Sequence, residues 1–149
     1  LKGAQLDEEL AALRTAYDQA KTEVKETEKQ LKNVNRSLRL LGQYYRTRKI
    51  YQSYHRCSNK KSYRAEHRSE LELYDAAVEE LRSIYSDGKF PPVQELKKEK
   101  SKLMEHKSEQ YENYREIQKH WMDVSKIVRN RDSFLKKQRE QERTESPKM

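Results

Sequence analysis

The stretch that decides the fold is residues 6–45, LDEELAALRTAYDQAKTEVKETEKQLKNVNRSLRLLGQYY. Its apolar and small residues recur at alternating steps of four and three, which is the seam pattern of a coiled coil. The members of this first seam are Leu6, Leu10, Leu13, Tyr17, Ala20, Val24, Thr27, Leu31, Val34, Leu38, Leu41 and Tyr45. We therefore expect one long helix over about residues 4–56.

A second seam with the same alternation lies toward the other end of the chain. Its members are Leu96, Lys100, Leu103, Lys107, Gln110, Tyr114, Ile117, Trp121, Val124, Val128, Arg131 and Leu135. The polar members weaken this seam, but the spacing still predicts a helix over about residues 92–138. We expect the charged residues 141–149 to form a flexible tail.

A shorter helix is expected between the two seams, over about residues 63–86. Its apolar stripe is made of Leu71, Tyr74, Val78, Leu81 and Tyr85. The segment SDGKFPPV, residues 86–93, ends this helix, because its glycine can adopt the left-handed conformation and its two prolines prevent continuation.

The two seams are equally long, so the long helices can cover each other. The predicted fold is all-α, a long antiparallel coiled-coil hairpin with a shorter third helix near its tip, in a single helical domain over residues 1–140. Pairing residues whose numbers sum to about 141 places Ala20 against Trp121, a small side chain opposite a large one. The alternative is that each long helix pairs with a second copy of the chain in a homodimer, since a seam does not identify its partner.

The composition favours an anionic partner. Lys and Arg number 33 against 25 Asp and Glu, and the net charge is +8. Such an excess attracts nucleic acid first and anionic membrane surfaces second. No apolar run approaches the roughly 20 residues that span a bilayer, and we expect no membrane partner. The single cysteine, Cys57, allows no intrachain disulfide and favours a reducing, cytoplasmic compartment.

One segment excludes acidic residues completely. Between Glu28 and Glu66 there is no Asp or Glu, while eleven Lys or Arg and five of the ten tyrosines lie there. Cations can neutralise phosphates and tyrosines can stack on unpaired bases, so we expect a DNA-binding tip. Its predicted residues are Arg46, Arg48, Lys49, Tyr51, Tyr54, Arg56, Lys60, Lys61 and Arg64. In the alternative reading, the tyrosine rings pack inward against the shorter helix while the cations point outward.

Nothing in the sequence predicts catalysis. The four histidines are scattered and form no HExxH motif, and His55 beside Cys57 supplies too few ligands for zinc. The three glycines build no phosphate-binding loop. We therefore expect no enzyme activity from this chain, and no metal or cofactor.

Three segments carry a family resemblance: AEHRSELELYDAAVEELRSIY (65–85), GKFPPVQELKKEKSKL (88–103) and RTRKIYQSYHRCSNKKSYRAEH (46–67). Together they resemble the helical region that follows the nuclease domain in relaxase or mobilisation nuclease proteins of conjugative and mobilisable elements. The resemblance implies a bacterial, non-catalytic accessory domain that contacts DNA, or relaxosome or secretion-channel proteins. Relaxases nick DNA with a catalytic tyrosine and a metal held by clustered histidines. This chain has no such histidine cluster, so we assign none of its tyrosines as a nucleophile. Since it begins at Leu1 rather than Met, we expect a fragment of a larger protein.

Overall fold

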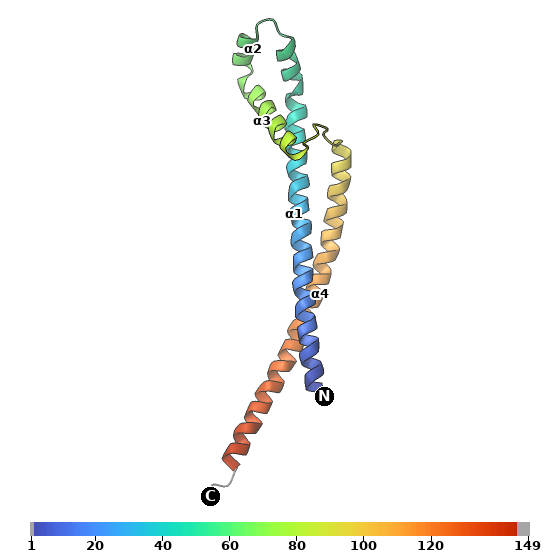
Figure 1. The fold of residues 1–149 in the computed structure, drawn as a ribbon, viewed down its shortest axis with the longest axis vertical. Helices are drawn as coiled ribbons and strands as arrows, with labels where there is room; N and C mark the ends of the chain where they lie inside the picture. Colours follow the sequence, from blue (N-terminus) through green and yellow to red (C-terminus); the bar gives the residue numbers. More distant parts are fainter. Residues whose placement is uncertain (1, 146–149) are drawn as a thin grey trace. The chain divides into compact units, whose positions relative to one another are not determined.

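The computed structural model describes residues 2–145, with the side chains of residues 3–144, and this part of the chain is built from helices (Figure 1). They are α1 (Lys2–Arg56), α2 (Lys60–Glu66), α3 (Arg68–Ile84) and α4 (Val93–Glu145). The all-α fold class is therefore confirmed. None of these helices, within the described residues, combines the length and the apolar character needed to cross a bilayer.

The segment expected as one helix over residues 63–86 consists of two helices. His67 separates them with a non-helical backbone (φ −113°, ψ 31°), and its N–H closes α2 on the Tyr63 carbonyl. The start of α2 is capped by Asn59, whose side-chain oxygen accepts from the Ser62 N–H at 3.2 Å. No Gly or Pro stands at the break, so the residue pattern did not predict it.

The tail expected over residues 141–149 is corrected in part. Helix α4 continues through Glu145, so residues 141–145 are helical, and residues 146–149 lie outside the described part. The physical reason is that the sequence holds no Gly or Pro between residue 93 and Pro147. Lys, Arg, Gln and Glu are good helix formers, and a charged composition alone does not end a helix.

The chain divides into two compact units. Unit 1 comprises Leu1–Glu26 and Lys107–Met149, and unit 2 comprises Thr27–His106. The single helical domain expected over residues 1–140 stays a prediction, because α1 and α4 each contribute to both units.

In unit 1, α1 and α4 run antiparallel around an aromatic layer. The ring of Tyr17 stacks on Tyr114 and on Trp121, with centroids 5.1 and 5.8 Å apart. The hydroxyls of Tyr17 and Tyr114 share a hydrogen bond of 2.9 Å, which raises the pKa of Tyr114 above its ordinary value. Ala20 and Val124 are buried and complete the seam of this unit.

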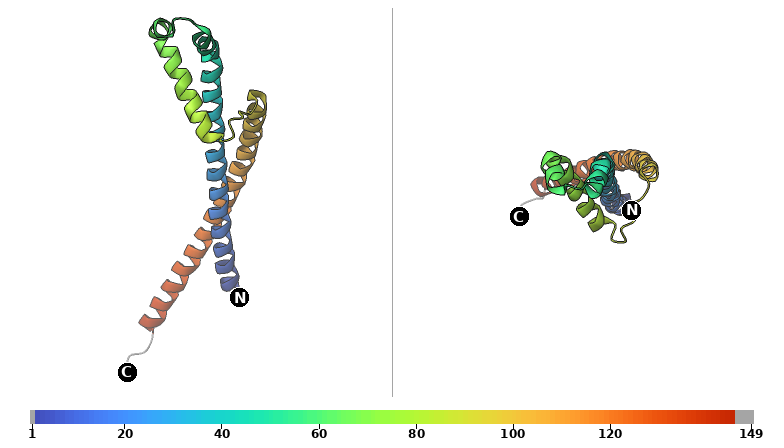
Figure 2. Two further views of the ribbon diagram at one scale, coloured as in Figure 1. Left: turned by 45° about the horizontal axis from the view of Figure 1, so that its top comes forward. Right: turned by 90° about the horizontal axis from the view of Figure 1, so that it is seen from above.

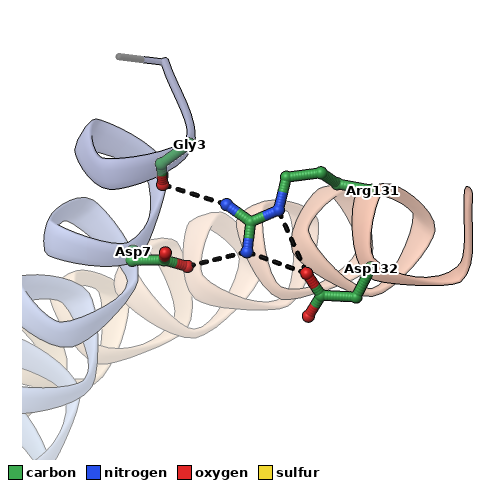
Figure 3. Close-up of polar contacts among 4 residues, drawn as sticks. All are labelled: Gly3, Asp7, Arg131 and Asp132. Atoms are coloured by element: carbon green, nitrogen blue, oxygen red, sulfur yellow. Dashed lines mark hydrogen bonds and ion pairs between the residues drawn. The ribbon is translucent and has the colours of Figure 1, made fainter. Parts of the chain in front are cut away.

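Arg131 joins the start of α1 to α4 (Figure 3). Its Nη1 donates to the Gly3 carbonyl oxygen at 2.9 Å, and its Nη2 donates to Asp7 Oδ1 at 3.0 Å. Nε and Nη2 also donate to Asp132 Oδ1, at 3.1 and 2.9 Å. Hydrogen bonds to Asp7 and then to Asp132 raise the pKa of Arg131. A residue expected as a polar interruption of the seam is thus an anchor between the two helices.

The register in unit 1 differs from the expected one. The expected pairing, in which the numbers of facing residues sum to about 141, places Tyr17 nearest Val124. In the structure the ring of Tyr17 lies against Tyr114 and Trp121. The same rule places Arg131 nearest Leu10, whereas it reaches Gly3 and Asp7. The observed contacts lie three to ten residues from the expected partners, and the repeat of a seam cannot detect such a shift because seam positions still meet.

In unit 2, α3 packs antiparallel against the second half of α1, and the start of α4 lies on another side of α1 (Figures 1 and 2). The Tyr85 hydroxyl donates to Ser37 Oγ at 3.0 Å, and Gln43 Nε2 donates to the Leu73 carbonyl at 2.8 Å. The core cluster is made of Val34, Leu40, Leu41, Leu81 and Leu96. The first seam is buried or half-buried except at Tyr45, which is 48% exposed.

Candidate nucleic-acid interface

All the residues predicted to bind DNA lie in unit 2, on the last turns of α1 and on α2. Those on α1 are Arg46, Arg48, Lys49, Tyr51, Tyr54 and Arg56, and those on α2 are Lys60, Lys61 and Arg64. Residues 57–59 link the two helices. The cations in this set are exposed, whereas Tyr51 and Tyr54 are half-buried.

The tyrosines form a ladder between α1 and the helices that follow it. Tyr51 stacks on Tyr74 of α3 with centroids 4.1 Å apart and planes 13° apart. Tyr44 lies 5.6 Å from Tyr74, and burial together with these two neighbouring rings raises the pKa of Tyr74. The stripe of aromatic rings thus holds α3 against α1.

The ladder continues to α2. Tyr54 lies 6.3 Å from Tyr63, and Tyr63 lies 4.3 Å from His67 at the break between α2 and α3. The rings are therefore engaged inside the unit, as in the alternative reading in which they pack inward. Stacking energy spent on these contacts is not available to unpaired bases.

Two of the predicted cations are also held by the unit. Arg48 lies over the ring of Tyr44 at 5.9 Å, and Arg64 lies over Tyr54 at 5.5 Å. Arg64 additionally pairs with Asp75 of α3 at 3.2 Å. The Tyr54 side chain first, and Asp75 after it, raise the pKa of Arg64. These arginines help to position α2 and the end of α1.

Apart from Arg64, the predicted cations lack carboxylate partners among the described residues. Among the described residues, no Asp or Glu lies within ion-pair distance of the cations other than Arg64 in the predicted set: Arg46, Arg48, Lys49, Arg56, Lys60 and Lys61. Arg46 donates from Nε to the Gly42 carbonyl at 3.3 Å and keeps its remaining donors. The arrangement leaves positive charge that a polyanion can neutralise.

Sequence reasoning missed two groups of residues around this surface. Tyr74 and Asp75 of α3 hold the tyrosines and Arg64, which required knowing that α3 folds back onto α1. Lys32 and Arg39 are exposed cations further back on α1. The pattern that could have identified them is their spacing, since Lys32, Arg39 and Arg46 follow one another at intervals of seven residues.

Within residues that the structure describes, no three His, Cys, Asp or Glu side chains converge as a metal site would require. Comparison of the chain with protein-family models, with curated proteins and with solved structures finds no match in any of the three.

Proposed function

We propose that unit 2 binds nucleic acid through its phosphate backbone, with the exposed cations at the end of α1 and the start of α2. The observation that carries the proposal is the acid-free interval of the sequence, whose cations at this end face solvent mostly without carboxylate partners. Binding of phosphates by such side chains releases condensed counterions, which supplies most of the sequence-independent affinity for nucleic acid.

The experiment compares two triple variants with the same net charge. Lys49→Gln/Lys60→Gln/Lys61→Gln removes three exposed cations from the interface. Lys97→Gln/Lys98→Gln/Lys102→Gln removes three exposed lysines from α4 in the same unit, where Glu95 and Glu99 are interspersed. Fluorescence anisotropy with labelled oligonucleotides at several salt concentrations gives the affinity of each variant.

We expect the unaltered chain to show a slope of log affinity against log salt of about −3.5 to −4.5, as for about five phosphates. The interface variant should reduce the magnitude of this slope by roughly 2 to 3, and the α4 variant should leave it nearly unchanged. Equal losses in both variants would show a response to net charge alone and would refute this site. Absence of salt-dependent binding by the unaltered chain would refute the function.

The wider setting that we propose is a non-catalytic accessory domain of a DNA relaxase in conjugative transfer or mobilisation. Its support is the resemblance of about residues 40–128 to the helical region of those proteins. In that setting the domain works in the bacterial cytoplasm, holding DNA near a nick site or docking relaxosome or secretion-channel proteins. The coding sequence around this segment tests the setting: a nuclease domain with clustered histidines would support it, and an unrelated domain would contradict it.

The second candidate function is a structural coiled-coil module for protein–protein interaction or dimerisation. It is favoured by exposed apolar side chains on α4 in unit 1, where Ile127 is 50% and Phe134 67% exposed. This function requires a specific mass above that of the monomer, or a tight protein partner, and no salt-dependent DNA binding. Light scattering on the same samples distinguishes it from the first candidate.

A further inference from the structure

In unit 2, α1 has a side that neither α3 nor α4 covers. Tyr44 contacts Tyr74 of α3, and Ser37 contacts Tyr85, which follows the last residue of α3, so both face that helix. A residue two positions further along a helix is rotated by about 200°, so Arg39 and Arg46 point away from α3. Leu41 is fully buried in the cluster that includes Leu96 of α4. We call the remaining exposed side of α1, from Lys32 to Arg56, the free face.

The free face is basic along its whole length. Lys32, Arg39 and Arg46 are seven residues apart and therefore form one row along the helix. Lys49 lies three residues after Arg46, and Arg56 lies seven after Lys49. These cations extend the row to the end of α1, and from Lys32 to Arg56 the row turns by about 120° around the helix. Over about 1.5 Å per residue the row is roughly 36 Å long. No acidic residue interrupts it, because the interval contains none.

The first part of the row borders a hollow of about 380 Å³. The hollow is lined by Lys32, Asn33, Asn35, Arg36 and Arg39, three cations and two amides, with no carboxylate among them. Arg36 keeps a partner, since its Nη2 lies 3.4 Å from Glu80 of α3, with both side chains about half exposed. Amide N–H groups and cationic side chains are donors that bind phosphate oxygens.

We propose that the whole free face, from the hollow at Lys32 and Arg39 to Arg56, forms one continuous row of phosphate contacts for duplex nucleic acid. The proposal rests on the proposed function and extends it in two respects. It adds a phosphate site about two to four helical turns before Arg46, where the predicted tip begins, and it names the duplex as the preferred form.

The preference for a duplex follows from what the surface offers. Tyr51 and Tyr54 are engaged with Tyr74 and Tyr63, so the surface presents charge and hydrogen-bond donors rather than free rings for stacking. A duplex carries one negative charge per about 1.7 Å of its axis, twice the density of one of its strands. A row of cations without stacking partners therefore gains more from a duplex than from a single strand of equal length.

The test uses a pair of double variants and two labelled probes of one sequence, a duplex and its single strand. Lys32→Gln/Arg39→Gln alters the hollow and leaves the Arg36–Glu80 ion pair in place. Lys98→Gln/Lys102→Gln removes the same charge from exposed positions of α4 in the same unit. Circular dichroism confirms that each variant remains helical.

We expect Lys32→Gln/Arg39→Gln to weaken duplex binding at least about tenfold at 0.1 M salt and to reduce the slope by about 1.8, with the control nearly unchanged. The unaltered chain should bind the duplex more tightly than the single strand. If the earlier Lys49→Gln/Lys60→Gln/Lys61→Gln variant loses affinity and Lys32→Gln/Arg39→Gln does not, the extension is wrong while the proposed function stands. Tighter binding of the single strand would overturn the duplex assignment, and no binding of either probe would refute the function itself.

Discussion

At the scale of single residues, the contacts of Arg131 explain how a weak seam becomes a defined pairing. One planar guanidinium reaches the Gly3 carbonyl and two carboxylates, with the arginine side chain 25% exposed. A lysine ammonium is a point charge and cannot reproduce this fork of donors. The contact fixes where α4 meets the first turn of α1, a property that an apolar seam leaves free to shift by a heptad.

Arg131→Ala should loosen the start of α1. We expect amide hydrogen exchange over about residues 4–10 to become faster, because Gly3 and Asp7 lose their link to α4. Arg131→Lys should restore the slow exchange only in part. Arg129→Ala, at an exposed position two residues earlier, is the matched control and should leave exchange unchanged. Equal exchange in the Arg131→Ala and Arg129→Ala proteins would contradict the anchor.

The hydroxyl pair of Tyr17 and Tyr114 predicts a pH dependence. The hydrogen bond between the two hydroxyls raises the folded-state pKa of Tyr114. Its contribution to the free energy of unfolding is therefore complete below the unfolded pKa of about 10 and is lost as the pH rises through the folded pKa. In Tyr17→Phe, the fall in the free energy of unfolding above about pH 10 should be smaller than in the unaltered chain, because the hydroxyl pair is absent. Urea unfolding followed by circular dichroism at pH 8 and above measures it. Tyr45→Phe, which removes a hydroxyl from a 48% exposed ring, should retain the full fall.

At the scale of elements, two glycines with opposite roles show what ends a helix and what a helix tolerates. Gly88 lies between α3 and α4 with φ +73°, a left-handed conformation that costs little without a Cβ. Gly42 lies inside α1, and a Cβ added there would meet nothing within 4 Å. Thus Gly42 is neither strained nor held by a close contact.

The substitution to Ala should therefore change stability in opposite directions at the two glycines. Gly42→Ala should raise the free energy of unfolding by about 0.5–1 kcal/mol, because it removes the entropic cost of glycine in a helix. Gly88→Ala should lower it by about 1 kcal/mol or more, because the backbone conformation is unfavourable for L residues although space is open. Urea unfolding of the two variants measures both, and a shift of the same sign would contradict the assigned conformations.

The sequence was sufficient for the long helices because their seams extend over many turns and no helix breaker interrupts them. It did not predict the break at His67, where the ring of His67 lies 4.3 Å from that of Tyr63 and no Gly or Pro marks the interruption. At the candidate site, the charge gap identified the exposed cations. Their division into free cations and cations held by rings or by Asp75 depends on how α3 folds back, which no local pattern encodes.

At the scale of the whole molecule, the net charge of +8 carries an energetic cost that a polyanion would relieve. Cations seven residues apart on the free face are separated by about 10 Å, which is comparable with the Debye length at 0.1 M salt and well within the roughly 30 Å at 0.01 M. Repulsion along the row should therefore be strongest at low ionic strength. The exposed pairs Arg36–Glu80 and Arg64–Asp75 act in the opposite sense, but exposed ion pairs contribute little.

Raising NaCl from about 0.01 to 0.15 M should thus stabilise the protein, with a higher midpoint of urea unfolding, because screening weakens repulsion on α1 more than it weakens the exposed pairs. Lys32→Gln/Arg39→Gln should show a smaller rise, since two members of the row no longer repel their neighbours. Lys98→Gln/Lys102→Gln should retain most of it, because mixed charges surround those lysines on α4. A midpoint that falls with salt in the unaltered chain would mean that ion pairs outweigh the row. The row would then not be the unneutralised surface on which nucleic-acid binding depends.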